Sequence, residues 1–162
     1  GIIPQNPTLF SGTIRSNLDP FNSYEDSVIW SAIEKCGLKA VIKSMEDGLD
    51  SKVAEYGENL SQGQRQLLCL GRVLLKDCKI LLLDEATSSV DFETDEMIQK
   101  TLREAFTETT ILTIAHRVNT IMDSDMILVL DKGVVSENGS PSELLGREDG
   151  EFKRIVDASH SQ

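Results

Sequence analysis

The chain lacks long apolar runs and an excess of basic residues. Its longest uninterrupted apolar stretches are only a few residues, far below the ~20 that a membrane-spanning helix needs. It carries 16 Lys and Arg against 27 Asp and Glu, a formal net charge of -11. Nucleic acids and anionic membrane surfaces attract positive charge. These absences exclude a membrane span within the sequence and disfavour a polyanion as the main partner.

Cysteine and histidine are too few for a disulfide framework or a zinc cluster. The three cysteines, Cys36, Cys69 and Cys78, are an odd number without metal-ligand spacing, and the two histidines add no zinc-binding pattern. We therefore expect reduced, mostly buried thiols, as in a cytosolic protein.

A phosphate-binding loop is also missing. No G-x-x-x-x-G-K-[ST] segment occurs in the 162 residues. The chain opens Gly-Ile-Ile-Pro, without an initiator Met or a signal-peptide pattern. The composition, 40% hydrophobic and 27% charged, is that of one soluble globular domain. We interpret the sequence as a fragment of a longer protein.

The order of helical and strand patterns predicts an α/β protein. Apolar residues between 28 and 36 recur at helical spacing and end at Gly37, and the first half is expected to be mainly helical. Short apolar runs follow at 80–83, 109–114 and 126–130. Such runs are typical of strands in a parallel sheet that is covered on both faces. A tight turn at 131–133, a strand at 134–135 and helices at 142–145 and 151–156 are expected to complete the chain.

Residues 60–64 read Leu-Ser-Gln-Gly-Gln and predict the start of a helix that can bind an anion. Ser61 can cap this helix, and Gln64 can reach back to the Ser61 amide in a capping box. The helix N-terminus offers unpaired amides, and Gly63 has no side chain to keep an anion away. An ordinary capped amphipathic helix is the alternative explanation.

Asp84 and Glu85 follow the apolar run 80–83 directly, at the edge of an α/β sheet where ligands usually bind. Asp84 can hold Mg²⁺, commonly through water. Glu85 can orient and deprotonate the water that attacks a γ-phosphate. A solvated strand end that caps the next turn is the alternative explanation.

Together these motifs resemble those of the ABC ATPases. Residues 60–64 resemble the signature motif, and residues 81–91, LLLDEATSSVD, resemble the Walker B strand followed by the D-loop. The resemblance implies a protein that uses ATP and Mg²⁺. It also implies a fold: a partial P-loop NTPase-type sheet with an inserted helical subdomain.

The same resemblance implies roles for three further residues. Gln5 would be the Q-loop glutamine that offers its amide oxygen to Mg²⁺ or to the attacking water. Asp91 would be the D-loop aspartate that contacts the opposing subunit near its phosphate loop. His116, within Ile-Ala-His-Arg, would be the switch histidine that hydrogen-bonds the γ-phosphate and positions Glu85.

Residues 17–21, residues 63–70 and Glu85 are most similar to the second nucleotide-binding domain of subfamily C transporters, the multidrug resistance-associated group. Gln62 stands where the common signature has glycine, which resembles the altered signatures of these second domains. On this pattern the chain divides into 1–24 (Q-loop and connection), 25–77 (helical subdomain and signature helix) and 78–162 (Walker B, D-loop, switch histidine and C-terminal elements). The phosphate loop and the adenine-stacking aromatic residue would precede Gly1.

The resemblance further implies two ATPase domains arranged head to tail. One ATP would contact Gln5, Asp84, Glu85 and His116, whereas Ser61, Gly63 and Gln64 would close over nucleotide on the other domain. The expected partners are the first nucleotide-binding domain and the transmembrane domains of the same transporter. The domain would lie on the cytoplasmic face of the plasma or vacuolar membrane and power export of organic anions, conjugates or amphipathic compounds.

Two other interpretations stay open. A soluble ABC-type ATPase of DNA maintenance shares the signature helix and Walker B, but it predicts coiled-coil heptads and a basic surface, and the sequence has neither. A non-catalytic interaction fragment is the second. Without a phosphate loop, the isolated 162 residues are expected to be inactive and to bind ATP weakly.

Overall fold

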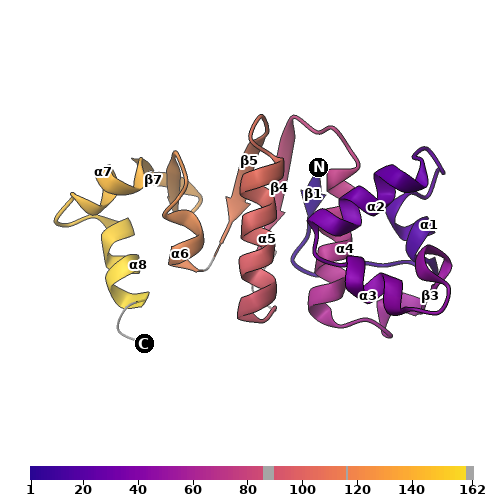
Figure 1. Ribbon diagram of the computed structural model, residues 1–162. Coiled ribbons are helices and arrows are strands. Elements are labelled where there is room, and N and C mark those ends of the chain that lie inside the picture. Colours follow the sequence, from indigo (N-terminus) through magenta and orange to yellow (C-terminus); the bar gives the residue numbers. More distant parts are fainter. Residues whose placement is uncertain (86–89, 116, 160–162) are drawn as a thin grey trace. The chain divides into compact units, whose positions relative to one another are not determined.

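A computed structural model describes residues 1–85, 90–115 and 117–159 (Figure 1). The chain forms two compact units, Gly1–Ile114 and Ala115–Gln162. No helix among the described residues is long and apolar enough to cross a bilayer.

The first unit contains a parallel sheet and most of the helices. Its elements are β1 (Ile2–Ile3), β2 (Gly12–Thr13), α1 (Ile14–Leu18), α2 (Asp26–Lys35), α3 (Lys39–Ser44), the 3-10 helix η1 (Gly48–Asp50), β3 (Lys52–Val53), the 3-10 helix η2 (Glu55–Gly57), α4 (Gln62–Leu74), β4 (Ile80–Asp84), α5 (Phe92–Ala105) and β5 (Thr110–Ile114). The predicted α/β class and the mainly helical first half are confirmed.

The parallel sheet has the strand order β1-β4-β5. Ile2 pairs with Leu82, and Leu82 pairs in turn with Leu112. All three strands run in the same direction, so their carboxyl ends meet at one edge. This register brings the chain just after residue 3 beside the chain just after residue 84.

Among the described residues of the unit Gly1–Ile114, side chains cover one face of this sheet. The buried face includes Ile3, Leu81 and Leu83, which join the core that α4 and α5 help to form. The opposite face is apolar and exposed, with Ile2, Ile80, Leu82, Leu112 and Ile114. This one-sided cover agrees with the partial sheet that the family resemblance implies. Because parallel sheets are normally covered on both sides, we expect this face to be an interaction surface.

Helix α2 ends as its sequence predicts. Gly37 has a φ of +71°, and its amide donates to the Glu34 carbonyl while the Leu38 amide donates to the Ile33 carbonyl. This is the Schellman arrangement, in which the left-handed position favours glycine. A Cβ on Gly37 would also lie 2.1 Å from the Met97 sulfur. The backbone conformation therefore favours glycine here, and a larger residue would also displace the end of the Met97 side chain.

The second unit is built on a hairpin. Its elements are α6 (Val118–Ile121), β6 (Ile127–Asp131), β7 (Val134–Gly139), α7 (Pro141–Leu145) and α8 (Glu151–Ser159). Strand β6 pairs antiparallel with β7, so the prediction that the run 126–130 belongs to the parallel sheet is wrong. The turn at Lys132 and Gly133 has positive φ at both residues, +48° and +81°. Such a turn joins adjacent antiparallel strands.

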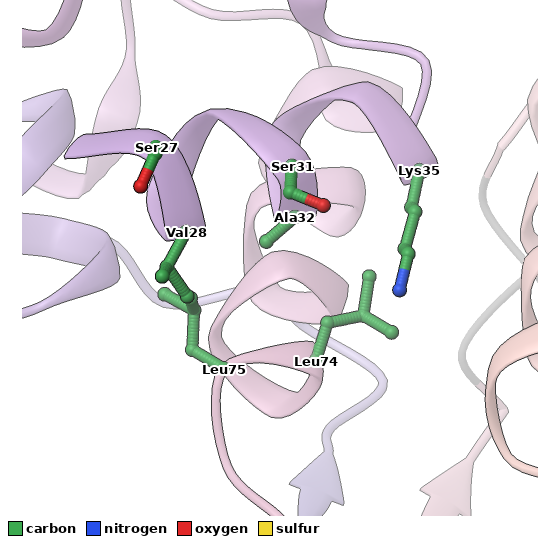
Figure 2. A pocket seen from close by; sticks show the side chains of 7 residues that line it. All are labelled: Ser27, Val28, Ser31, Ala32, Lys35, Leu74 and Leu75. Carbon is green, nitrogen blue, oxygen red and sulfur yellow. The ribbon is translucent and has the colours of Figure 1, made fainter. Parts of the chain in front are cut away.

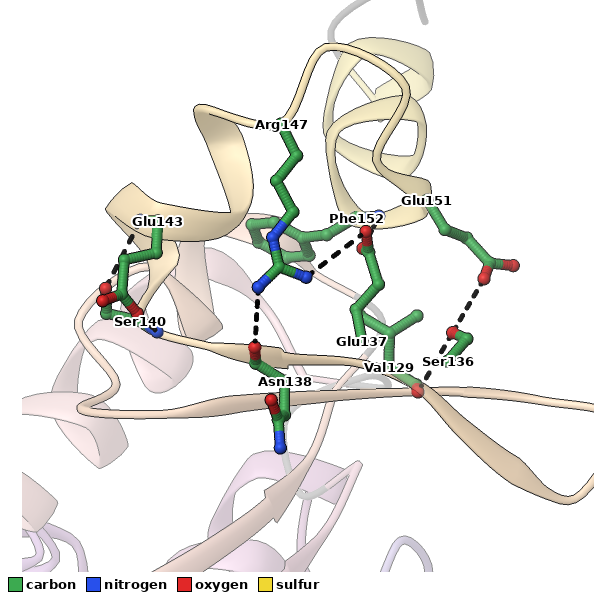
Figure 3. Close-up of polar contacts among 9 residues, drawn as sticks. All are labelled: Val129, Ser136, Glu137, Asn138, Ser140, Glu143, Arg147, Glu151 and Phe152. Atoms are coloured by element: carbon green, nitrogen blue, oxygen red, sulfur yellow. Dashed lines mark hydrogen bonds and ion pairs between the residues drawn. The ribbon is translucent and has the colours of Figure 1, made fainter.

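Apolar and polar contacts join the hairpin to α7 and α8. Ile127, Val129, Leu144, Phe152 and Val156 form its small core. Figure 3 shows the polar contacts around that core. Glu137 accepts a hydrogen bond from the Phe152 amide at 2.9 Å, and Ser136 donates to Glu151 at 2.9 Å. These bonds fix the first turn of α8 to β7.

Candidate nucleotide-hydrolysis site

Gln5 and Glu85 meet at the carboxyl edge of the parallel sheet. The Gln5 Nε2 donates to the Glu85 Oε2 at 2.6 Å, although the two residues are 80 positions apart in the sequence. Their strands, β1 and β4, are neighbours. The amide nitrogen faces the carboxylate, because a carboxylate only accepts. The amide oxygen of Gln5 is therefore the group left for a cation or a water.

Glu85 has an unusual backbone conformation. Its φ is +46°, in the left-handed region that non-glycine residues seldom adopt, and its amide donates to the Ile114 carbonyl of β5 at 2.9 Å. Strained residues of this kind cluster at functional sites, where the surrounding structure enforces them. The conformation turns the chain sharply after Asp84.

Asp84 is the last residue of β4 and has an exposed side chain. No group of three or more His, Cys, Asp or Glu within 1–85, 90–115 and 117–159 is placed to hold a metal ion. Mg²⁺ differs from metals held in closed protein cages, since one or two carboxylates, waters and substrate phosphates commonly complete its shell. The donor set of Asp84 and the Gln5 amide oxygen fits Mg²⁺ held together with a nucleotide.

The predicted capping box at the start of α4 is confirmed. The Ser61 Oγ accepts from the Gln64 amide at 3.1 Å, and the Gln64 Oε1 accepts from the Ser61 amide at 3.0 Å. Gln62, the first residue of the helix, accepts from the Arg65 guanidinium at 2.8 Å. The helix therefore begins with a defined geometry, and the positive end of its dipole lies at Ser61.

Gly63 is buried against α5, which differs from the sequence argument that it keeps space free for an anion. A Cβ on Gly63 would lie 2.9 Å from the Thr94 Oγ1. Asp91 caps α5 and accepts from the Thr94 amide at 2.9 Å and from the Thr94 hydroxyl at 2.8 Å. Close packing of α4 on α5 thus explains the glycine. The same contact links the signature helix to the residue assigned to the D-loop.

Hydrogen bonds from the backbone amide of Thr94, and then from its hydroxyl, hold the pKa of Asp91 below its ordinary value. We expect Thr94→Val to raise this pKa part of the way to its ordinary value, because the hydrogen bond from the Thr94 backbone amide remains. A carboxyl whose pKa is lowered in the folded state stabilises the fold above its unfolded-state pKa, and this stabilisation is lost as the pH falls through the folded-state pKa. NMR titration of Asp91 checks the shift. Thr107→Val, a change at an exposed loop residue, should leave it unaltered, and an equal shift in both variants would contradict the assignment.

The three thiols are free. Burial raises the pKa of Cys36 to about 12, and burial also raises that of Cys69 despite the opposing effect of Arg72. Cys78 is partly buried. The prediction of mostly buried cysteines is confirmed.

An open pocket lies away from these residues. Its lining residues, on α2 and at the end of α4, are Ser27, Val28, Ser31, Ala32, Lys35, Leu74 and Leu75 (Figure 2). The far end of α4 is about 18 Å from its start at 1.5 Å per residue. The pocket therefore does not belong to the site around Ser61.

The structure groups the predicted residues into two sets. Gln5, Asp84 and Glu85 share the sheet edge. Ser61 caps α4, and Gly63 and Gln64 lie in its first turn. His116 and residues 86–89, which include the first two residues of the predicted D-loop (88–91), lie outside the described residues.

Sequence reasoning missed three residues that support the first set: Asn17, Gln66 and Arg72. Of these three, only Gln66 could have been identified from its neighbours in the sequence, because it is a polar residue among leucines on a predicted helix.

Comparison with known proteins agrees with this geometry. The ABC transporter family model matches residues 1–88. The chain belongs to the ABC transporter family. Three relatives illustrate the similarity. ABC transporter C family member 3 of Arabidopsis thaliana is 55% identical over 96% of this chain and 10% of its own length. ABC transporter C family member 3 of Dictyostelium discoideum is 57% identical over 99% and 11%. Human ATP-binding cassette sub-family C member 2 is 59% identical over 89% and 9%.

A solved structure supports the same conclusion. A bacterial Atm1-family ABC exporter with ATP bound matches the whole chain with a TM-score of 0.91 and 36% identity, over 29% of the exporter chain. The predicted ABC ATPase fold and the resemblance to subfamily C are confirmed. The chain spans about a tenth of the length of the curated relatives. ABC transporter domains are generally ATPases, so the sheet edge and the α4 terminus are the parts of this chain to examine for nucleotide chemistry.

Proposed function

We propose that this chain is part of the ATP-hydrolysing domain of a membrane exporter. The observation that carries the proposal is the hydrogen bond between Gln5 and Glu85 at the carboxyl edge of the sheet. It joins a neutral amide to the carboxylate best placed to act as a base, and it leaves the amide oxygen available to Mg²⁺ or water. A general base must lie within hydrogen-bond reach of the proton that it removes.

In the proposed reaction Glu85 orients the attacking water and accepts its proton. Asp84 and the Gln5 oxygen would hold Mg²⁺, partly through water. When bound, Mg²⁺ neutralises charge on the β- and γ-phosphates. His116 hydrogen-bonds the γ-phosphate and keeps Glu85 in position. Catalysis of phosphoryl transfer depends mainly on such positioning and on electrostatic stabilisation.

The second set of residues acts on a different nucleotide. Ser61, Gly63 and Gln64 close over ATP held by another domain, because a helix N-terminus offers amides and a positive dipole to phosphate. Asp91 contacts that domain near its phosphate loop. The partners are a first nucleotide-binding domain and the transmembrane domains of the same transporter. The domain works on the cytoplasmic face of the plasma or vacuolar membrane, where ATP turnover drives export of organic anions, conjugates or amphipathic compounds.

Substitutions of Ser61 separate helix capping from phosphate binding. Aspartate caps a helix about as well as serine, whereas alanine costs about 1 kcal/mol. We expect the full-length Ser61→Asp protein to be as stable as the unmodified protein but to hydrolyse ATP about thirtyfold more slowly. The new carboxylate repels the negatively charged phosphate. Denaturation and steady-state hydrolysis measure the two effects.

Ser140 provides a matched control, because it caps α7 in an equivalent capping box. Ser140→Asp should change neither property. Full hydrolysis by Ser61→Asp would rule out a phosphate contact at this helix.

A further inference from the structure

Both ends of the segment that carries Gln5 are held by side chains of α4. The Gln66 Nε2 donates to the Pro4 carbonyl at 3.3 Å. The Arg72 Nη1 donates to the Thr8 carbonyl at 2.7 Å. Residues 4–8 therefore form an arch over α4, with Gln5 next to its first anchor.

Gln66 is a polar residue in the core, only 1% exposed. A buried amide is costly unless it is hydrogen-bonded, so the bond to Pro4 fixes the place where the chain leaves β1. Pro4 and Pro7 also restrict the backbone of the arch, because each ring locks its own φ. The arch is consequently stiff between its anchors.

Arg72 holds the second anchor with its whole guanidinium group. Besides Thr8, it donates from Nε to the Asn17 carbonyl at 2.6 Å and from Nη2 to the Asn17 Oδ1 at 2.7 Å. Asn17 is 3% exposed and bonds both the amide and the carbonyl of Phe10, at 2.9 and 2.8 Å. The Phe10 ring lies 5.8 Å from the guanidinium carbon. A lysine cannot make this set of bonds, since they need the planar fork of arginine.

We propose that Gln66 and Arg72 are positioning residues that hold Gln5 in reach of Glu85. They fix the arch to the same helix whose first turn carries Ser61 and Gln64. The hydrolytic centre of one nucleotide is thereby attached to the helix that closes over the other. This inference rests on the function proposed above for Gln5 and Glu85.

The test uses the full-length protein with Gln66→Ala and Arg72→Lys, each alone and together with Gln5→Ala. Each single change should lower kcat for ATP hydrolysis about tenfold, because a hydrogen bond to a buried or charged group is lost. The KM for ATP should stay within about twofold. In the Gln5→Ala background neither change should lower kcat further, because the effects of substituting residues that act through one another do not add. Lys76→Ala, which removes an exposed cation just beyond α4, is the matched control and should equal the unmodified protein.

Backbone order parameters measured by NMR give a second readout that does not depend on turnover. The order parameters of Gln5, Asn6 and Thr8 should fall from ~0.85 to below ~0.6 in Gln66→Ala and in Arg72→Lys, and should stay unchanged in Lys76→Ala. Unchanged order parameters, or an equal loss of kcat with and without Gln5, would overturn the positioning role. Full turnover by Gln5→Ala would instead refute the proposed function, and the order parameters would still decide whether the two side chains anchor the arch.

Discussion

Replacing Glu85 with glutamine in the full-length protein is expected to slow ATP hydrolysis by a factor on the order of a hundred to ten thousand, the range for loss of a general base. ATP affinity should stay within about twofold of its original value, because the change removes a proton acceptor without removing a phosphate contact. Single-turnover hydrolysis and equilibrium nucleotide binding measure the two quantities separately.

In the environment of Glu85 this substitution removes the proton acceptor and leaves the local structure unchanged. The new amide has the same shape as the carboxylate and still offers an oxygen to the Gln5 nitrogen, which lies 2.6 Å from the Glu85 Oε2. The strained backbone at φ +46° is unaffected by a change at the end of the side chain. Loss of turnover therefore reports on the missing base.

Glu96 supplies the control for this experiment. It is an exposed residue of α5, and Glu96→Gln removes the same charge without touching the sheet edge. Hydrolysis should be unchanged in that variant. Near-normal turnover by Glu85→Gln would show that another group, or water alone, accepts the proton.

Local signals in the sequence predicted much of the fold. Strands β4, β5 and β6 lie within one residue of the predicted runs, because a short run of apolar residues bounded by polar ones is typical of a strand. The capping box of Ser61 and the stop at Gly37 were also predicted correctly. Each depends on residues a few positions apart, and such interactions are visible in the sequence.

Contacts between distant residues account for what the sequence did not predict. β1 is two residues long and is a strand only because it pairs with β4. The turn at 131–133 was predicted from local residues, whereas the placement of β6 in a two-stranded sheet with β7 was not. Likewise, no local pattern places Arg72 beside Asn17, 55 positions earlier.

The candidate site shows the same division. Asp84, Glu85 and the α4 terminus follow from short motifs, and Gln5 follows from family resemblance. The bond between Gln5 and Glu85 needs the parallel register of β1 and β4. The packing of Gly63 on Thr94 needs the approach of two helices. Motifs thus identify the reacting groups, whereas tertiary structure determines which of them touch.

Leu70 is the position at which we expect a core substitution to cost most. It lies in the middle of α4 with 0% exposure, where the helix packs against β1, α1, α2 and α5. Leu70→Ala should lower the free energy of unfolding by about 2 to 5 kcal/mol, since surrounding groups are held too firmly to fill the cavity. Urea unfolding followed by fluorescence measures this loss. Trp30, the single tryptophan, packs against the same core.

Leu74 is the matched control because it lies one turn further along the same helix but is only partly buried. Figure 2 shows its side chain at the open pocket between α2 and α4. Leu74→Ala should cost about 1 kcal/mol, because water already reaches the site and no closed cavity forms. Equal losses in the two variants would contradict the inferred packing of α4. A larger loss at Leu70 would show that the helix carrying Ser61, Gln66 and Arg72 is fixed by its buried face, as the attachment of Gln5 to that helix requires.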